Sequence, residues 1–177
     1  MTQSHMTQTQ MNQIPSQVDQ KAFRNALGQF ATGVTVITTL DNQGNKIGMT
    51  ANSFSSVSLE PMLVLWSIAR SSNAVDEFTN ADRFAIHVLH AEQQALSNQF
   101  ASKCEDRFCN VEHEEGLGGV PLLKDYSAVF QCQTEHQYDG GDHIIIVGRV
   151  MAFDNRGLPP LIFHAGRYAD LELPVAV

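Results

Sequence analysis

The sequence lacks the features that mark nucleic-acid-binding and membrane-spanning proteins. Its formal net charge is −8, and its 11 Lys and Arg residues form no local cluster that would attract a phosphate backbone. It contains no apolar run of the length that a transmembrane helix needs. Its three cysteines are odd in number, which is more typical of thiols in a reducing compartment than of a disulfide framework. We therefore expect neither a nucleic-acid partner nor a membrane partner.

The N-terminal segment lacks both the basic start and the apolar stretch of a secretory signal. Residues 1–17 are rich in Gln and Thr, and no charged side chain precedes Asp19. Apolar residues make up 43% of the chain and charged residues 17%, which is the composition of a globular protein. We expect a disordered polar tail over residues 1–17, one domain over residues 18–177 and a cytoplasmic location.

The fingerprints of several common enzyme classes are also missing. There is no GxxxxGK[ST] motif, no GxGxxG motif between a strand and a helix, and no GxSxG motif. Cys104, Cys109 and His113 outline a zinc site, but their spacing differs from the usual CxxC step and a fourth ligand is missing. The sequence therefore favours neither a P-loop protein, a Rossmann dehydrogenase, a serine hydrolase nor a metalloprotein.

The hydrophobic pattern predicts many short strands and few helices. Apolar residues at helical spacing predict helices over residues 19–30 and 91–102, and Asn73 is placed to cap a third over residues 74–80. Alternating and β-branched residues predict six strands, over residues 34–40, 47–57, 62–69, 83–89, 128–138 and 143–153.

The connections complete this prediction. We expect a hairpin turn over residues 41–46, in which Gly44 and the two Asn residues supply the unusual backbone angles. Residues 110–125 are predicted as a surface excursion, and residues 160–171 as an extended final segment. The expected fold is mainly β (β or α+β), a small barrel of six or seven mostly antiparallel strands with a few peripheral helices.

Small polar side chains are unusually frequent in two of these predicted strands. Residues 49–72 read MTANSFSSVSLEPMLVLWSIARSS, with hydroxyl and amide groups on both faces of the first strand. Buried polar groups cost free energy unless they are hydrogen-bonded. Cross-strand hydrogen bonds would satisfy them, and so would a bound planar heterocycle with a phosphate at the turn over residues 67–73. The residues alone leave both interpretations open.

The stretch GGDH, residues 140–143, also has two interpretations. It is a typical tight turn between strands. Equally, Asp142 could hold the His143 imidazole in one tautomer at the mouth of a barrel.

Several long stretches resemble one known family. They read FRNALGQFATGVTVIT, GMTANSFSSVSLEPMLVLWSI, LSNQFAS, GGVPLL, YDGGDHIIIVGRV and PLIFHAGRY, and they run in order from about Phe23 to Leu171. The sequence is similar to the short-chain flavin reductases, FMN-binding split-barrel proteins that serve two-component monooxygenases. Two departures stand out, namely Cys109-Asn110 where the family often has Ala-Gly, and Phe163 where it often has Tyr.

The resemblance implies a site. The flavin ring and ribityl chain would lie along Gly48, Met49, Thr50, Ala51, Asn52 and Ser53. The phosphate end would be held by the segment that contains Ser67, Ile68, Ala69, Ser72 and Asn73, while Gln99 and Phe100 would close the pocket. On the nicotinamide side the resemblance implies Tyr168 and the catalytic residue His143, with no metal.

The resemblance also implies an activity. The protein would transfer hydride from NADH or NADPH to FMN or FAD, and the reduced flavin would diffuse to a separate oxygenase. A homodimer is implied, with the pocket near the subunit interface. The alternatives are a flavin oxidase, a reductase acting on iron or cobalamin, and a non-catalytic flavin- or haem-binding module. For haem, the candidate axial ligands are His87, His90, His143 and His164.

Overall fold

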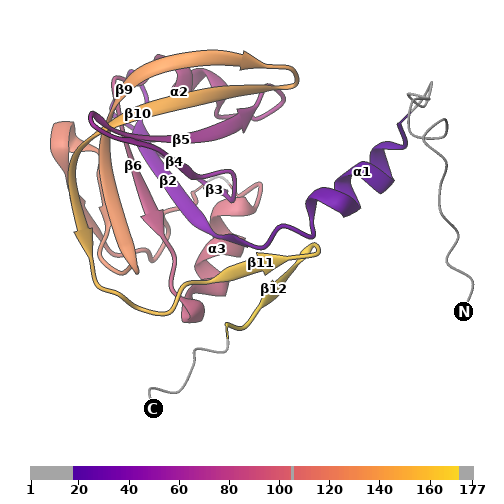
Figure 1. The fold of residues 1–177 in the computed structure, drawn as a ribbon. Coiled ribbons are helices and arrows are strands. Elements are labelled where there is room, and N and C mark those ends of the chain that lie inside the picture. Colours follow the sequence, from indigo (N-terminus) through magenta and orange to yellow (C-terminus); the bar gives the residue numbers. More distant parts are fainter. Residues whose placement is uncertain (1–17, 105, 172–177) are drawn as a thin grey trace, which may run out of the picture.

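The fold is dominated by β-strands with a few short helices around them (Figure 1). A computed structural model describes residues 18–104 and 106–171, so the predicted polar tail lies outside the described residues. The helices are α1 (Gln20–Leu27), α2 (Val75–Asn80), α3 (Gln94–Ala101) and the 3-10 turns η2 (Ala91–Gln93) and η3 (Leu117–Gly119). The described residues form twelve strands: β1 (Thr32–Gly33), β2 (Thr35–Leu40), β3 (Lys46–Ala51), β4 (Ser55–Leu59), β5 (Met62–Ala69), β6 (Arg83–Val88), β7 (His113–Glu115), β8 (Pro121–Leu123), β9 (Ala128–Gly140), β10 (His143–Asn155), β11 (Ile162–His164) and β12 (Arg167–Ala169).

Seven strands make one curled sheet in the order β3-β2-β6-β9-β10-β5-β4, and all of its pairs are antiparallel. The long hairpin of β9 and β10 forms the centre of this sheet, with the predicted tight turn at Gly141. This confirms the mainly β, mostly antiparallel architecture. The edge strands β3 and β4 do not pair with each other, so the barrel has a split between its two edges.

The predicted strand over residues 47–57 is wrong. The chain leaves β3 after Ala51, bends through residues 52–54, and re-enters the sheet as β4 on the opposite edge. The bend is fixed by Ser53, whose hydroxyl accepts from the N–H of Ser67 at 2.9 Å and donates to the Ser67 carbonyl at 3.0 Å. The Ser53 side chain thus hydrogen-bonds to β5 just before β4 begins at Ser55.

The predicted surface excursion over residues 110–125 is also wrong. Strands β7 and β8 form a hairpin, and all three residues of β8 are buried. Leu122 and Val120 pack with Ala85 and Val129 in a small apolar cluster, so burial of this strand stabilises the outer face of β6.

Smaller differences concern the ends of elements. Helix α1 ends at Leu27 because Gly28 caps it, three residues before the predicted end. The N-cap of α2 is Ala74 rather than Asn73. In the hairpin turn only Gly44 has a positive φ, so the two Asn residues do not supply the unusual backbone angles predicted for them. The side chain of Asp41 stabilises the turn by accepting from the N–H groups of Gln43 and Asn45. The final segment folds back as the hairpin of β11 and β12.

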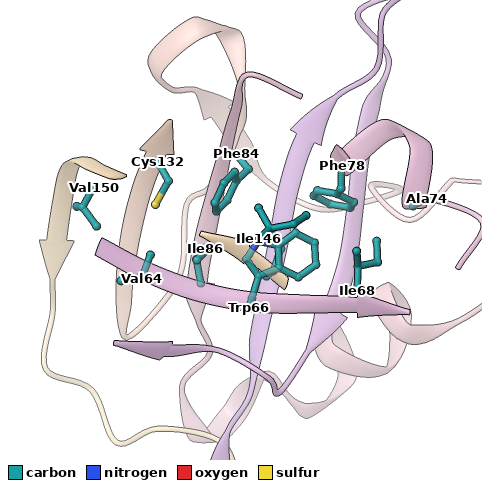
Figure 2. Packing of buried hydrophobic residues seen from close by; sticks show 11 residues of the cluster. Val64, Trp66, Ile68, Ala74, Phe78, Phe84, Ile86, Cys132, Ile146 and Val150 are labelled. Atoms are coloured by element: carbon teal, nitrogen blue, oxygen red, sulfur yellow. The ribbon is translucent and has the colours of Figure 1, made fainter. Parts of the chain in front are cut away.

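The barrel interior is filled by one apolar cluster, shown in Figure 2. Strand β5 alternates, so that Trp66 and Ile68 point inward while Ser67 faces the other side. The Trp66 ring packs edge-on against Phe78 and Phe84, with centroids 4.9 and 6.1 Å apart. Each such buried side chain contributes roughly 1.5–3 kcal/mol. This core fixes β5 and α2, the elements that carry the predicted phosphate end.

Candidate functional site

Two cavities lie at the two ends of the β3 segment. One, of about 630 Å³, is lined by Asn52, Thr32 and Phe163 together with the end of α1. The other, of about 220 Å³, is lined by Gly48 and Asn73 among others. Since a strand rises about 3.3 Å per residue, Gly48 and Asn52 are separated by on the order of 13 Å. The two cavities thus border the stretch Gly48–Ser53 that the resemblance assigns to the flavin.

Gly48 allows the backbone of β3 to pack closely on two aromatic rings. A Cβ atom at Gly48 would lie 2.5 Å from the Phe100 ring and 3.2 Å from Phe108. Phe100 is fully buried, and its ring meets Phe108 edge-on at 5.1 Å. Phe100 therefore packs against the backbone of β3, whereas the resemblance has it close the flavin pocket.

The Gln99 side chain also makes its hydrogen bonds within the protein. Its side-chain amide donates to the carbonyls of Arg107 and Cys109 at 2.8 and 2.9 Å. These two bonds hold the loop after α3, and the same loop lines the smaller cavity through Arg107. Closure of the pocket by Gln99 would therefore be indirect.

The hydroxyl groups of the β3 segment are largely used within the protein. Thr50 donates to the carbonyl of Ser97 at 2.6 Å, and the Ser53 hydroxyl is engaged with Ser67. Hydrogen bonds within the protein thus satisfy these two hydroxyls, as one of the two interpretations of this stretch expects, and their contact with a flavin stays a prediction. Asn52 is exposed and lines the larger cavity. A ligand along β3 would therefore meet the Asn52 amide and the backbone of this edge strand, while Met49 and Ala51 pack against the core.

The predicted phosphate segment combines buried and accessible positions. The Ile68 side chain is buried in the core, and Ala69 pairs with His143 of β10, so these residues offer mainly backbone. The Ser72 hydroxyl accepts from the N–H of Ala74 at 3.3 Å, and among the described residues it donates no hydrogen bond. Together with Asn73 in the smaller cavity, it forms a polar turn at the end of β5.

Tyr168 belongs to a hydrogen-bonded network on α3. Its hydroxyl lies 2.8 Å from Ser97 Oγ and donates to Asn98 Oδ1 at 2.9 Å. Because the Ser97 carbonyl also accepts from Thr50, the network joins β12, α3 and β3. It positions the strand on which a flavin would lie.

His143 begins β10 and is held by Asp142. Its Nδ1 lies 2.7 Å from Asp142 Oδ1, and this hydrogen bond, followed by the imidazole charge, lowers the pKa of the Asp142 carboxyl. The Asp142 carbonyl accepts from the N–H of Arg70 at 2.9 Å, and the Arg70 guanidinium is paired with Asp139. The fixed-imidazole interpretation of the GGDH stretch is thus consistent with the geometry, next to the end of β5.

The structure does not bring His143 and Tyr168 together within one chain. The turn between β9 and β10 lies at the top of the view in Figure 1, and the hairpin of β11 and β12 lies at the bottom. The implied nicotinamide side is therefore divided between two regions of the molecule.

Sequence reasoning missed four polar residues at the site. Thr32 lines the larger cavity and Glu77 the smaller one, and among the described residues Thr32 Oγ1 and Glu77 Oε2 are buried without a hydrogen-bond partner. Arg107 donates to the carbonyl of Gly48 at 2.8 Å, and Ser97 links Thr50 to Tyr168. Only Arg107 carries a sequence signal, since it directly precedes Phe108 in the stretch where the family pattern was noted.

One candidate haem ligand, His87, is engaged within the protein. His87 is fully buried, its Nδ1 lies 3.1 Å from the Val36 carbonyl, and its Nε2 accepts from the N–H of Leu123 at 3.1 Å. Both ring nitrogens are therefore engaged. Among residues 18–104 and 106–171, no group of three or more His, Cys, Asp or Glu side chains is arranged to hold a metal ion. Over the same residues, no helix is long and apolar enough to cross a membrane.

Comparison with known proteins gives the family. The family model described as "Flavin reductase like domain" matches residues 27–172. FMN reductase (NADH) SmoA of Agrobacterium fabrum is 45% identical over 155 residues, which cover 88% of each chain. A Rhizobium meliloti protein described as a probable flavin reductase is 49% identical, over 85% of this chain but only 48% of its own length. This chain thus spans about half of that relative. Other relatives are named as reductase components or subunits of flavin-dependent monooxygenases.

A solved structure supports the same assignment. The NADH:FAD oxidoreductase SgcE6 of Streptomyces globisporus, in complex with NAD and FAD fragments, superposes with a TM-score of 0.84. It is 34% identical, and the alignment covers 89% of this chain and 96% of SgcE6. Its agreement with the curled antiparallel sheet confirms the split-barrel fold. With a family model that matches most of its length, the chain belongs to the family of flavin reductase like domains.

Proposed function

We propose that this chain is an NADH-dependent flavin reductase, which transfers hydride to FMN or FAD and releases reduced flavin to a separate flavin-dependent oxygenase. The observation that carries the proposal is the β3 segment, because its two ends line two cavities on the residues that the family resemblance assigns to flavin. The names of the relatives support both the flavin and NADH. The oxygenase partner is supported by relatives named as reductase components of monooxygenases.

The role of the protein is to bind and orient. When bound, flavin and nicotinamide supply the redox chemistry themselves. The backbone N–H groups of the edge strand β3 are the donors available to stabilise negative charge on the ring. Ser72 and Asn73 would hold the phosphate end. Holding the two reactants side by side in one site accounts for a large part of the rate acceleration. Because the two cofactors carry the redox chemistry, the hydride transfer requires no protein acid or base.

We assign His143 to the positioning of the nicotinamide. With Nδ1–H assigned as the donor to Asp142, Nε2 is the ring nitrogen left to accept a hydrogen bond from a ligand. The carboxamide N–H of nicotinamide is a matching donor. This assignment gives His143 a binding role rather than a proton-transfer role.

We further propose a homodimer that works in the cytoplasm. His143 and Tyr168 lie on opposite sides of one chain, so a nicotinamide that touches both needs a second copy. Helix α1 has no buried residue, and it exposes Phe23 and Leu27 by 56% and 59%. A second copy covering this apolar face explains why the helix projects from the barrel in Figure 1. The cysteines Cys104, Cys109 and Cys132 are free thiols, which supports a reducing compartment.

The activity is tested by mixing the purified chain with NADH and following absorbance at 340 nm. We expect NADH oxidation that requires added FMN or FAD and saturates with flavin. A chain that binds flavin, turns yellow and leaves NADH unchanged would instead be a binding module, and the proposal would be wrong.

A further inference from the structure

The larger cavity differs from its neighbours in charge. Among the described residues it is lined by one cation, Arg24, and by no Asp or Glu. Four smaller cavities, by contrast, are each lined by at least one carboxylate. Since the chain has 19 Asp and Glu residues against 11 Lys and Arg residues, an anionic ligand meets less repulsion in the larger cavity than in the others.

The Arg24 guanidinium is available to such a ligand. Arg24 lies in the last turn of α1, and within residues 18–104 and 106–171 its guanidinium makes no ion pair or hydrogen bond. Four other arginines are each paired with a carboxylate, namely Arg70, Arg83, Arg149 and Arg156. A guanidinium can present two parallel N–H groups to a phosphate, and such charge-assisted hydrogen bonds are roughly twice as strong as neutral ones.

The wall that carries Arg24 is held to the barrel. The Gly28 carbonyl, at the end of α1, accepts from the N–H of Ala165 at 2.8 Å, and the Gly28 N–H donates to the Arg24 carbonyl at 3.0 Å. Ala165 lies in the turn between β11 and β12, which Figure 1 shows beside the end of α1. Ala165 and Gly166 of this turn also line the cavity. These hydrogen bonds therefore fix the backbone of Arg24 at one side of the cavity.

The rest of the lining offers an aromatic ring and several amides. Phe163 is half-buried and packs edge-on against Tyr168, with ring centroids 5.5 Å apart, so its ring is held beside the cavity. Asn25, Gln29 and Asn52 are exposed amides that line the same space. At about 630 Å³ the cavity lies within the roughly 300–1,000 Å³ of sites that enclose a whole ligand. A cation, a fixed aromatic ring and amides are the contacts that the phosphate, base and ribose of a nucleotide require.

Asn52 connects this cavity with the proposed flavin segment. It lines the cavity and belongs to the stretch Gly48–Ser53 that the resemblance assigns to the flavin. Hydride transfer requires the nicotinamide ring to lie against the flavin ring, so the rest of the cosubstrate must occupy space next to that ring. The larger cavity provides this space.

We propose that Arg24 binds the pyrophosphate of NADH in the larger cavity. The pyrophosphate carries the negative charge of the cosubstrate, whereas the flavin phosphate lies at the other end of β3, at Ser72 and Asn73. Arg24 therefore contributes to the binding of NADH, contributes little to the binding of flavin, and takes no part in hydride transfer. The inference rests on the proposed function and adds the residue that recognises the charged part of the cosubstrate.

The test compares NADH with dihydronicotinamide riboside, which carries the same redox ring and no phosphate. Arg24→Gln should raise the KM for NADH about tenfold and leave kcat and the KM for the riboside within about twofold. Lys21→Gln is the matched control, since it removes the same charge from an exposed position of α1 outside the cavity lining, and it should change neither KM. Arg24→Lys keeps the charge and should recover part of the NADH affinity.

Binding is also measured without turnover, by calorimetric titration of the chain saturated with oxidised FMN. The Kd for NAD⁺ should be about tenfold higher in Arg24→Gln than in the wild-type chain, and added salt should reduce this difference. The Kd for FMN should not change.

The possible outcomes separate this inference from the proposed function. The inference is overturned if Arg24→Gln leaves the KM for NADH unchanged, if it raises the KM for NADH and for the riboside equally, or if it weakens FMN binding instead. A chain that oxidises NADH equally well with and without Arg24 overturns the inference and leaves the reductase function standing. A chain that oxidises neither cosubstrate with either flavin overturns both.

Discussion

His143 is proposed to position the nicotinamide through one ring nitrogen. Its Nδ1 is committed to Asp142, so only Nε2 is available to a ligand. Loss of one hydrogen bond of about 1 kcal/mol corresponds to a change of about fivefold. We therefore expect His143→Ala to raise the KM for NADH about fivefold and to leave the Kd for flavin nearly unchanged. Steady-state kinetics and flavin titration measure the two quantities.

A control variant separates the effect of the His143 imidazole from the effect of Asp142, which holds it. Asp142→Asn keeps a hydrogen-bond acceptor beside Nδ1, so it should raise the KM for NADH less than His143→Ala does. Equal losses of NADH and flavin affinity in His143→Ala would show that the residue shapes the whole site rather than the nicotinamide side.

His87 links stability to pH. Burial lowers the pKa of His87 from 6.5 to about 4, because the charged imidazolium would lose its hydration. The unfolded chain therefore binds a proton that the folded chain does not bind between these two values. Stability is fully present above pH 6.5 and falls as the pH drops toward 4, by about 3 kcal/mol.

Urea unfolding at a series of pH values measures this effect. The free energy of unfolding should be flat from pH 8 to 7 and should decline between pH 6.5 and 4. The surface carboxyls whose pKa is lowered, such as those of Asp41, Glu135 and Asp142, lose their contribution only below their ordinary values near 4. A free energy that does not change down to pH 4.5 would contradict the assignment to His87.

At the scale of elements, the contact of β3 with α3 controls the site. A Cβ atom at Gly48 would lie 2.5 Å from the Phe100 ring, which is too close for either element to stay in place. We expect Gly48→Ala to lower the free energy of unfolding by about 1–3 kcal/mol. It should also weaken flavin binding, because β3 shifts. Urea unfolding and flavin titration of the same variant measure both effects.

Gly33 provides the matched control. A Cβ atom there would meet no heavy atom within 4 Å, and the backbone has no positive φ. Gly33→Ala should therefore change stability and flavin affinity little. If Gly48→Ala behaved like Gly33→Ala, the close contact between β3 and α3 would not matter for the site.

Elements with local signals were predictable from the sequence, and those fixed by distant partners were not. The β9–β10 hairpin follows from two alternating runs around a Gly-Gly turn. The break between β3 and β4 has no such signal, since it depends on the hydrogen bonds of Ser53 with Ser67, fourteen residues away. Likewise the flanks of β8 are polar and glycine-rich, and its burial depends on packing against β6 and β9.

The site shows the same division. The segments that the resemblance assigns to the flavin were recognisable because they are continuous stretches of sequence with polar residues in strands. Glu77 and Arg107 were not, because α2 and the loop after α3 meet at the smaller cavity only in the folded chain. The sequence also could not indicate that the hydroxyl of Thr50 is used by Ser97.

At the scale of the whole molecule, the exposed face of α1 predicts self-association. Phe23→Glu places a charge on this face and should shift the chain from dimer to monomer. Lys21→Glu is the matched control, since it reverses a charge on the same helix at an exposed polar position. Sedimentation velocity measures both variants. A wild-type chain that sediments as a monomer at all concentrations would contradict the homodimer.

The central claim is that a flavin lies along β3, and a crystal structure of the chain with bound FMN tests it most directly. The account predicts that the ring lies beside Thr50–Ser53 and the phosphate beside Ser72 and Asn73. Electron density for FMN at another place, with the two cavities at the ends of β3 filled only by water, would contradict it.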